Sequence, residues 1–124
     1  MKRHPPAGPL FTDLYELTMA AGYYRQGLHN QRATFSVFAR NPGNRRNYFV
    51  AGGLETVLAE LASYRFTIDD SAFLRSLGIF PEAFLDYLGR LRFTGDIWAL
   101  PEGTLFFPEE PIMEISAPLI EAQL

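Results

Sequence analysis

The sequence predicts a mixed α+β or α/β domain that contains a small antiparallel sheet and several short helices. Three patterns support this fold class. A helical pattern with a capping signal opens the chain, segments of alternating polarity follow it, and short capped helical patterns lead to β-type segments in the last third. The 124 residues, 48% of them hydrophobic, suffice for one domain with a single core.

Composition and charge exclude several classes of protein. The net charge of −3 argues against a nucleic-acid binder. No apolar run approaches the ~18 residues of a membrane span, and the Pro-rich residues 1–10 are expected to form a flexible tail and not a secretion signal. Because the chain has no cysteine, it offers neither a disulfide nor a thiolate metal site, and the cytoplasm is the expected location.

The first helix is expected at residues 12–26. Asp13 and Glu16 have the spacing of a capping box, in which Asp13 accepts from a free backbone N–H and Glu16 reaches back. Thr12 is the alternative cap. Gly27 is expected to end the helix in a left-handed conformation.

This helix carries two apolar faces. The face expected to enter the core consists of Leu14, Leu17, Ala21, Tyr24 and Leu28. A different face carries Tyr15, Met19 and Tyr23, each four residues after the last. A helix that is apolar on two faces is either fully buried or has a second partner, so binding is expected at the second face.

Two strands are expected after this helix. Residues 33–40 alternate in polarity, and residues 48–51 form a shorter apolar run. A turn signal at residues 41–44 lies between them, so the two strands are predicted to pair antiparallel across it.

Three short helices are predicted in the middle of the chain. One begins at Leu54 after a glycine pair. The next begins at a capping box over residues 67–70 and ends at Gly78. The third has Pro81 at its first position. These helices are interpreted as scaffold.

The last third returns to β-type patterns. A strand is expected at residues 96–100, and residues 104–107 and 112–116 are expected to form a hairpin or a small meander. Residues 119–124 begin a helical pattern that has no C-cap, so a truncated helix and a larger parent protein are expected.

Several chemistries are excluded by the residues present. Lys2 is the single lysine, which leaves no lysine for a P-loop, a Schiff base or a lipoyl-type carrier. His4 lies in the tail and His29 in a loop, and neither has a partner at metal-ligand spacing, so no metal site is predicted.

Asp13, Tyr15 and Arg40 remain as candidates for substrate binding. A tyrosine ring can stack on a flat aromatic substrate, and an arginine at a strand end offers its guanidinium to phosphate or carboxylate. Residues 1–62 hold seven Lys/Arg against four Asp/Glu, which favours a small anion. The structural alternatives stay open: Asp13 caps the helix, Tyr15 lies in the core and Arg40 is solvated.

Six ordered blocks resemble the N-terminal part of the nicotinate phosphoribosyltransferases, and the resemblance runs from residue 10 to residue 124. The blocks are residues 11–19 (FTDLYELTM), 33–40 (ATF leading to FAR), 51–55 (AGGLE), 91–96 (LRFTGD), 101–103 (PEG) and 118–124 (PLIEAQL). Six blocks in order are far more specific than one short motif.

The resemblance implies an activity. Such enzymes join nicotinate to phosphoribosyl pyrophosphate and give nicotinate mononucleotide and pyrophosphate for NAD synthesis. ATP hydrolysis assists through a phosphorylated histidine, and Mg²⁺ accompanies the phosphates. The fold implied is an N-terminal α/β domain beside an irregular α/β barrel, in a homodimer whose N-terminal helix closes the active site of the other subunit.

The resemblance also implies roles for three residues. Tyr15 matches the tyrosine that stacks on the pyridine ring, Asp13 matches the acid beside it, and Arg40 matches a basic residue near the sugar phosphate. Arg45 or Arg46 is an alternative source of that positive charge, because the residues that flank Arg40 depart from the family pattern.

No catalytic residue is expected in this chain, because the family's phosphorylated histidine and phosphate loops lie in the barrel, which is absent here. The resemblance divides the chain into a tail (1–10), the N-terminal α/β domain (11–118) and the start of a truncated helix (119–124). The chain alone is therefore expected to be inactive, with neither Mg²⁺ nor ATP bound.

Two alternatives remain. The first block also resembles the related nicotinamide phosphoribosyltransferases, whose substrate is an amide and not an acid. A non-catalytic interaction module is the other reading, in which the face of Tyr15 and Tyr23 is a plain protein interface.

Overall fold

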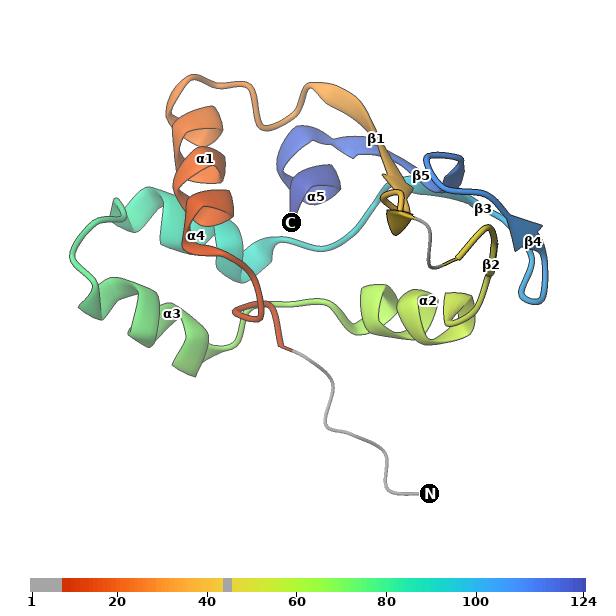
Figure 1. Ribbon diagram of the computed structural model, residues 1–124. Coiled ribbons are helices and arrows are strands. Elements are labelled where there is room, and N and C mark those ends of the chain that lie inside the picture. The colour runs from red at the N-terminus through yellow and green to blue at the C-terminus, as the bar shows by residue number, and fades with distance from the viewer. Residues whose placement is uncertain (1–7, 44–45) are drawn as a thin grey trace.

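A computed structural model describes residues 8–43 and 46–124, and within these ranges the chain forms five helices and five strands (Figure 1). The helices are α1 (Leu14–Arg25), α2 (Leu54–Ser63), α3 (Ile68–Ser76), α4 (Glu82–Arg90) and α5 (Leu119–Gln123). The strands are β1 (Arg32–Phe38), β2 (Phe49–Val50), β3 (Asp96–Ala99), β4 (Leu105–Phe106) and β5 (Pro111–Pro118). The mixed α+β class is confirmed. Most of the predicted tail, residues 1–7, lies outside the described residues.

The larger sheet is antiparallel and has the strand order β1-β5-β3. Its register places Phe35, Ile115 and Ile97 in one row across the three strands, so one face of the sheet is apolar. The opposite face is polar. There Arg32 donates to the Asp96 carboxylate at 3.0 Å and to the Ser116 carbonyl at 2.9 Å.

The predicted pairing of the first two strands across the turn is wrong. β1 pairs with the eight-residue β5, whereas β2 pairs with β4 in a separate two-stranded sheet. β2 is only two residues long because Gly52 and Gly53 follow it, so it cannot match the length of β1. Stacked rings of Phe49 and Phe106, 5.4 Å apart, hold the small sheet together.

The predicted hairpin between residues 104–107 and 112–116 is also wrong. The loop between β4 and β5 closes on itself, because the Glu110 carboxylate accepts from the Phe107 N–H at 2.7 Å. Glu109, with φ of 69°, donates its N–H to the Ala39 carbonyl at 2.8 Å. With the loop held in this way, β5 pairs with β1, and β4 pairs with β2.

The core lies between the helices and the end of the sheet. Its largest fully buried side chains come from three helices: Leu74, Phe84, Leu88 and Ile120. In Figure 1, α1, α4 and α5 gather at this end, while α2 lies apart from them below the sheet. None of the described helices is long and apolar enough to cross a bilayer.

The core face of α1 differs from the predicted stripe. Leu17 and Ala20 are buried. Leu14, the first residue of α1, is 52% exposed, and Leu28, three residues beyond its last, is 39% exposed. On the predicted second face Tyr15 is exposed, but Tyr23 packs against the core. Three of the five predicted core positions, Leu17, Ala21 and Tyr24, therefore lie in or against the core, and Tyr23 of the second face joins them.

The predicted capping box of α1 is wrong. Asp13 is the N-cap residue, but its side chain makes no capping hydrogen bond. Glu16 does not reach back, because its Oε2 accepts from Gln123 Nε2 of α5 at 2.6 Å. Two other predicted helix ends are confirmed. The capping box at Thr67 and Asp70 forms, and Gly27, with φ of 71°, has the predicted left-handed conformation after α1. Pro81 is the N-cap of α4 and not its first residue.

Candidate substrate-binding site

Asp13 and Tyr15 lie together at the exposed start of α1, and the Tyr15 side chain is 57% exposed. Arg40 lies elsewhere. The predicted strand ends at Phe38, so Arg40 stands in the exposed loop two residues beyond β1. In the view of Figure 1, the start of α1 and the end of β1 lie on opposite sides of α5. Asp13 and Tyr15 are thus neighbours at one helix start, while Arg40 lies on a different element. The residues just before α1 and the end of β1 nevertheless line the same cavity.

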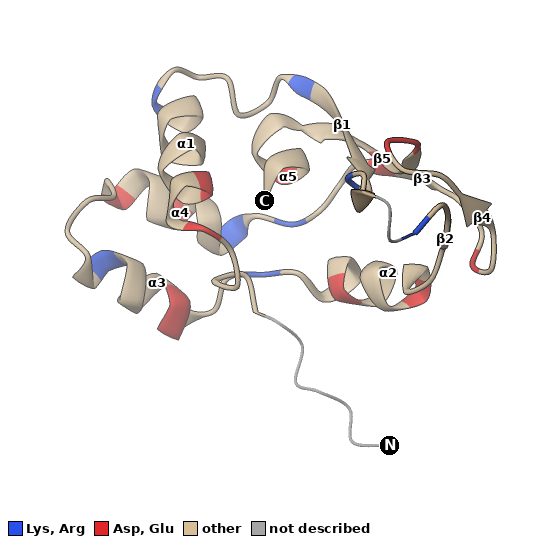
Figure 2. Cartoon of the chain, in the orientation of Figure 1, with Lys and Arg blue, Asp and Glu red and all other residues tan. Residues whose placement is uncertain are grey.

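The charge distribution has the same division. Figure 2 shows acidic residues at the start of α1 and basic residues at the end of β1 and in the loop that leads to β2. Arg46 is exposed in that loop, and Arg45 lies outside the described residues. The loop after β1 also lies beside the acidic loop between β4 and β5, because Glu109 donates its N–H to the Ala39 carbonyl, so carboxylates accompany these arginines. At the start of α1, a phosphate would meet carboxylates alone.

The Tyr15 hydroxyl is held in its protonated form. A side-chain hydrogen bond to Glu16 and the negative charge of that carboxylate raise the pKa of Tyr15 above its ordinary value of 10.0, with a smaller effect from Asp13. A tyrosine hydroxyl is protonated at neutral pH at its ordinary pKa as well, so it can donate a hydrogen bond while the ring stacks. Glu16 is in turn fixed by Gln123, so α5 helps to position the start of α1.

A large cavity in the described part of the chain is lined by none of the three candidates. It has a volume of about 630 Å³ and lies between α2, the apolar face of the β1-β5-β3 sheet, the end of α5 and the residues that precede α1. Its walls are mainly apolar and include Phe35, Val37, Val57 and Ile115.

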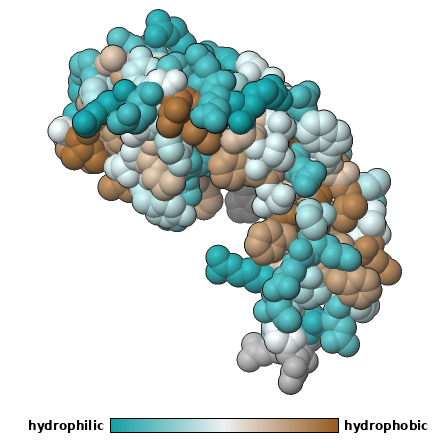
Figure 3. All heavy atoms as spheres, turned by 90° about the horizontal axis from the view of Figure 1, so that it is seen from above, coloured by the Kyte–Doolittle hydropathy of each residue, from teal (hydrophilic) through white to brown (hydrophobic). Residues whose placement is uncertain are grey.

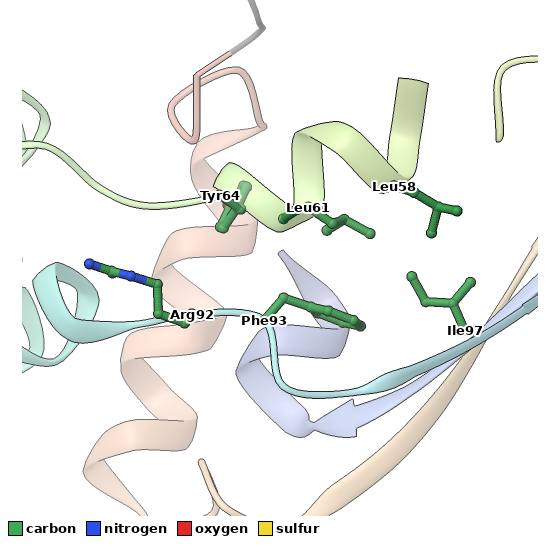
Figure 4. Close-up of a pocket in the computed structure, with 7 residues that line it drawn as sticks. Leu58, Leu61, Tyr64, Arg92, Phe93 and Ile97 are labelled. Carbon is green, nitrogen blue, oxygen red and sulfur yellow. The ribbon is translucent and has the colours of Figure 1, made fainter. Parts of the chain in front are cut away.

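A smaller cavity of about 240 Å³ continues from it and shares Leu61, Tyr64 and Phe93. Figure 4 shows Leu58 and Leu61 of α2 directed toward Phe93 and Ile97, while the Arg92 side chain extends away from them. We call the two connected cavities the α2 groove. Burial raises the pKa of Tyr64, on the wall of the groove, to about 12.

Two carboxylates that were not predicted from the sequence join segments of the domain that are far apart along the chain. Glu102 Oε1 accepts from the Gly53 N–H at 2.9 Å and from the Glu55 N–H at 3.4 Å, so it supplies the cap that Gly53 cannot. Glu121 Oε2 accepts from the Thr94 N–H at 2.6 Å. Each pair joins two of the six blocks that are far apart in the sequence.

The described part of the chain contains no group of three or more His, Cys, Asp or Glu side chains that could hold a metal ion. His29 lies between the rings of Tyr24 and Tyr87, with centroids 5.0 and 5.4 Å away. It is therefore packed with aromatic side chains and is not part of a polar cluster.

Comparison with known proteins identifies the family. The sequence-family model of the nicotinate phosphoribosyltransferase (NAPRTase) N-terminal domain matches residues 10–124 of this chain. The chain belongs to this family. The match covers nearly all the described residues of this chain, including the start of α1, the glycine pair before α2 and the residues of α5.

The relatives of this NAPRTase N-terminal domain agree with the assignment. The chain is 48% identical over 117 residues to nicotinate phosphoribosyltransferase pncB2 of Mycobacterium tuberculosis, which covers 94% of this chain and 25% of that protein. It is 42% identical over 115 residues to the Bacillus subtilis nicotinate phosphoribosyltransferase, which covers 93% and 24%. The chain thus spans about a quarter of the length of these relatives.

Solved structures support the fold. The crystal structure of human nicotinic acid phosphoribosyltransferase matches 90% of this chain and 23% of its own, with a TM-score of 0.80 and 36% identity. A nicotinate-nucleotide pyrophosphorylase from Pyrococcus furiosus, at 20% identity and a TM-score of 0.61, shares the fold alone.

Proposed function

We propose that this domain is the N-terminal portion of an enzyme that joins nicotinate to phosphoribosyl pyrophosphate, with release of pyrophosphate, in the salvage of NAD. The observation that carries the proposal is the 48% identity to a nicotinate phosphoribosyltransferase over 94% of the chain. ATP hydrolysis, a homodimeric assembly and a cytoplasmic location belong to the same proposal.

In this proposal Tyr15 covers the pyridine ring of nicotinate. Its exposed ring supports that role, because an aromatic face must be accessible in order to stack. Stacking would hold the ring nitrogen in line with the ribose carbon from which pyrophosphate departs. Asp13, beside Tyr15, would contact the substrate at the edge of the same surface.

Arg40 would approach the sugar phosphate, with Arg46 as the other described source of positive charge. Tyr15 lies in α1 and Arg40 lies beyond the end of β1, and positions on different elements favour two distinct contributions to catalysis. In a homodimer, the start of α1 could then serve the active site of one subunit while Arg40 serves the other.

Mg²⁺ and ATP would be held by the part of the enzyme outside this chain. The described residues do not fit a magnesium site, because they contain no cluster of three carboxylate or histidine side chains. Accordingly we propose that the 124-residue chain by itself catalyses no turnover.

The experiment that tests the function is a hybrid enzyme. In this hybrid the chain replaces the 117 matched residues of the M. tuberculosis relative, and formation of nicotinate mononucleotide is measured with phosphoribosyl pyrophosphate and ATP. We expect turnover by the hybrid and none by the 124-residue chain. A folded hybrid that makes no product would contradict the proposal.

A further inference from the structure

The first turn of α1 is held neither by its N-cap residue nor by burial of its first side chains. Within the described part of the chain, the Asp13 side chain makes no capping hydrogen bond. The first two residues of the helix, Leu14 and Tyr15, are 52% and 57% exposed, and burial begins only at Leu17. A helix start without a cap or packing frays, because its first N–H groups have no partner in the helix. The turn that carries Tyr15 therefore depends on another contact.

A side-chain hydrogen bond from α5 supplies such a contact. Gln123 Nε2 donates to Glu16 Oε2 at 2.6 Å and to Met19 Sδ, one turn further along α1, at 3.8 Å. Both N–H groups of the Gln123 amide thus have an acceptor on the same side of α1. Because the Glu16 acceptor is ionised, its bond is the stronger of the two.

The short helix α5 is itself fixed in the core. Ile120 is fully buried and belongs to the same core cluster as Leu17. On the same helix, Glu121 accepts from the Thr94 N–H at 2.6 Å, which joins α5 to the segment before β3. Gln123 therefore extends from a well-held element and connects the exposed start of α1 to it.

We propose that Gln123 is a positioning residue for the nicotinate site, and that it acts through Glu16 to hold the ring of Tyr15 in the orientation that stacks. The inference rests on the proposed function, because it takes Tyr15 as the residue that covers the pyridine ring. Glu16 follows Tyr15 directly in the chain, and the two side chains share a hydrogen bond. Holding Glu16 therefore restrains both the backbone and the side chain of Tyr15, and orientation of this kind contributes to the rate.

The test uses variants of the hybrid enzyme, with the KM for nicotinate and the KM for phosphoribosyl pyrophosphate measured separately. Gln123→Met keeps the length of the side chain and removes its amide. Arg75→Met is the matched control, because Arg75 of α3 donates to Glu82 at the start of α4, and so joins a different pair of helices. Thermal unfolding of each variant checks that it is folded.

We expect Gln123→Met to raise the KM for nicotinate by roughly 2- to 12-fold, the range that the loss of an aromatic stack produces. The KM for phosphoribosyl pyrophosphate should not change, and Arg75→Met should leave both KM values unchanged. Glu16→Gln keeps an acceptor oxygen for the Gln123 amide, so its KM for nicotinate should stay below that of Glu16→Ala. An unchanged KM for nicotinate in Gln123→Met would overturn the inference.

A double variant separates positioning of the ring from a general structural effect. A hybrid that carries Tyr15→Ala has no ring to orient, so the addition of Gln123→Met should leave its KM for nicotinate unchanged. A further increase of that KM in the double variant would overturn the inference, because Gln123 would then act on something other than Tyr15.

Hydrogen exchange of the 124-residue chain tests the contact without any substrate. We expect Gln123→Met to speed the exchange of the amides of residues 16–18 by about tenfold, as the loss of a hydrogen bond to a charged group does. The amides of residues 22–25, in the last turn of α1, should be unaffected. Unchanged exchange at residues 16–18 would overturn the inference whether or not the hybrid is active. A folded hybrid that makes no product contradicts the proposed function, whereas an active hybrid with an unchanged KM in Gln123→Met contradicts the role of Gln123 alone.

Discussion

Gly95 lies where the neighbouring strand leaves no room for a side chain larger than a hydrogen atom. A Cβ at this position would lie 2.4 Å from the Ala117 Cβ and 2.7 Å from the Ser116 carbonyl oxygen. Gly89 in α4 has nothing within 4 Å of the same atom. Two glycines of one chain therefore have opposite steric surroundings.

We expect Gly95→Ala to lower the free energy of unfolding by about 1–3 kcal/mol, because β5 must shift to admit the methyl group. Gly89→Ala, the matched control, should raise it by roughly 0.5–1 kcal/mol through helix propensity. Urea unfolding of both variants measures the difference. Equal effects of the two substitutions would show that the close contact at Gly95 is absent in solution.

The contributions of the Tyr15 ring and of the Tyr15 hydroxyl to substrate binding can be measured separately. In the hybrid enzyme, Tyr15→Phe keeps the ring and removes the hydroxyl, whereas Tyr15→Ala removes both. Since stacking is worth about 0.5–1.5 kcal/mol, we expect Tyr15→Ala to raise the KM for nicotinate by roughly 2- to 12-fold. Tyr15→Phe should retain most of the affinity. An unchanged KM in Tyr15→Ala would remove this residue from the site.

At the scale of elements, α2 depends on a cap that comes from 49 residues away. Glu102 accepts from the N–H groups of Gly53 and Glu55 at the start of the helix. We expect Glu102→Ala to destabilise α2 by about 1 kcal/mol, and hydrogen exchange of the α2 amides to report the loss. Glu102→Gln, which keeps an acceptor oxygen without the charge, should exchange at an intermediate rate. Unchanged exchange in Glu102→Ala would contradict the capping role.

A second prediction concerns the contact between α3 and α4. Arg75 donates to both oxygens of Glu82, at 2.6 and 2.9 Å, and this hydrogen bonding lowers the pKa of Glu82 below its ordinary value of 4.5. A carboxylate with a lowered pKa in the folded state stabilises that state above the ordinary pKa, and the contribution is lost as the pH falls through the folded-state pKa.

Glu82→Gln should therefore be slightly less stable than the unchanged chain at pH 7, and the difference should disappear at a pH well below 4.5. Both side chains are more than half exposed, so the effect at pH 7 is expected to be small. Thermal unfolding at the two pH values measures it. A stability difference between the two proteins that grows as the pH falls would contradict the stabilising role of the Arg75–Glu82 pair.

The elements also show what the sequence can and cannot predict. The helices could be predicted from the sequence because their signals are local. The capping box at Thr67 and Asp70, for example, needs residues only three apart. Strand pairing was not, because β1 finds its partner about 80 residues later in β5. A partner far along the chain also explains the capping error at α1, where Gln123, 107 residues after Glu16, donates to the Glu16 carboxylate.

The candidate site was only partly predictable for the same reason. The exposed surface of Asp13 and Tyr15 follows from positions within one helix. Whether Arg40 lies near Tyr15 depends on how the sheet and the helices are arranged, which no spacing in the sequence determines. The resemblance named the residues, and the structure located them at the start of α1 and beyond the end of β1.

At the scale of the whole molecule, the described residues leave much apolar surface uncovered. Nineteen large hydrophobic side chains are exposed, whereas twelve hydrophobic residues form the buried core. Figure 3 shows apolar side chains at the surface of the lobe that carries β2 and β4, where Val50, Leu105 and Phe107 are each more than half exposed. A domain with this surface is expected to be covered by further protein.

The central claim is that this domain contributes to a site for nicotinate, and the most direct test is the acceptor specificity of the hybrid enzyme. Product formation is measured with nicotinate and with nicotinamide under the same conditions. We predict that kcat/KM for nicotinate exceeds that for nicotinamide by about tenfold or more, as in sites that bind a specific polar group. Product from nicotinamide alone, or none from either substrate in a folded hybrid, would contradict the account.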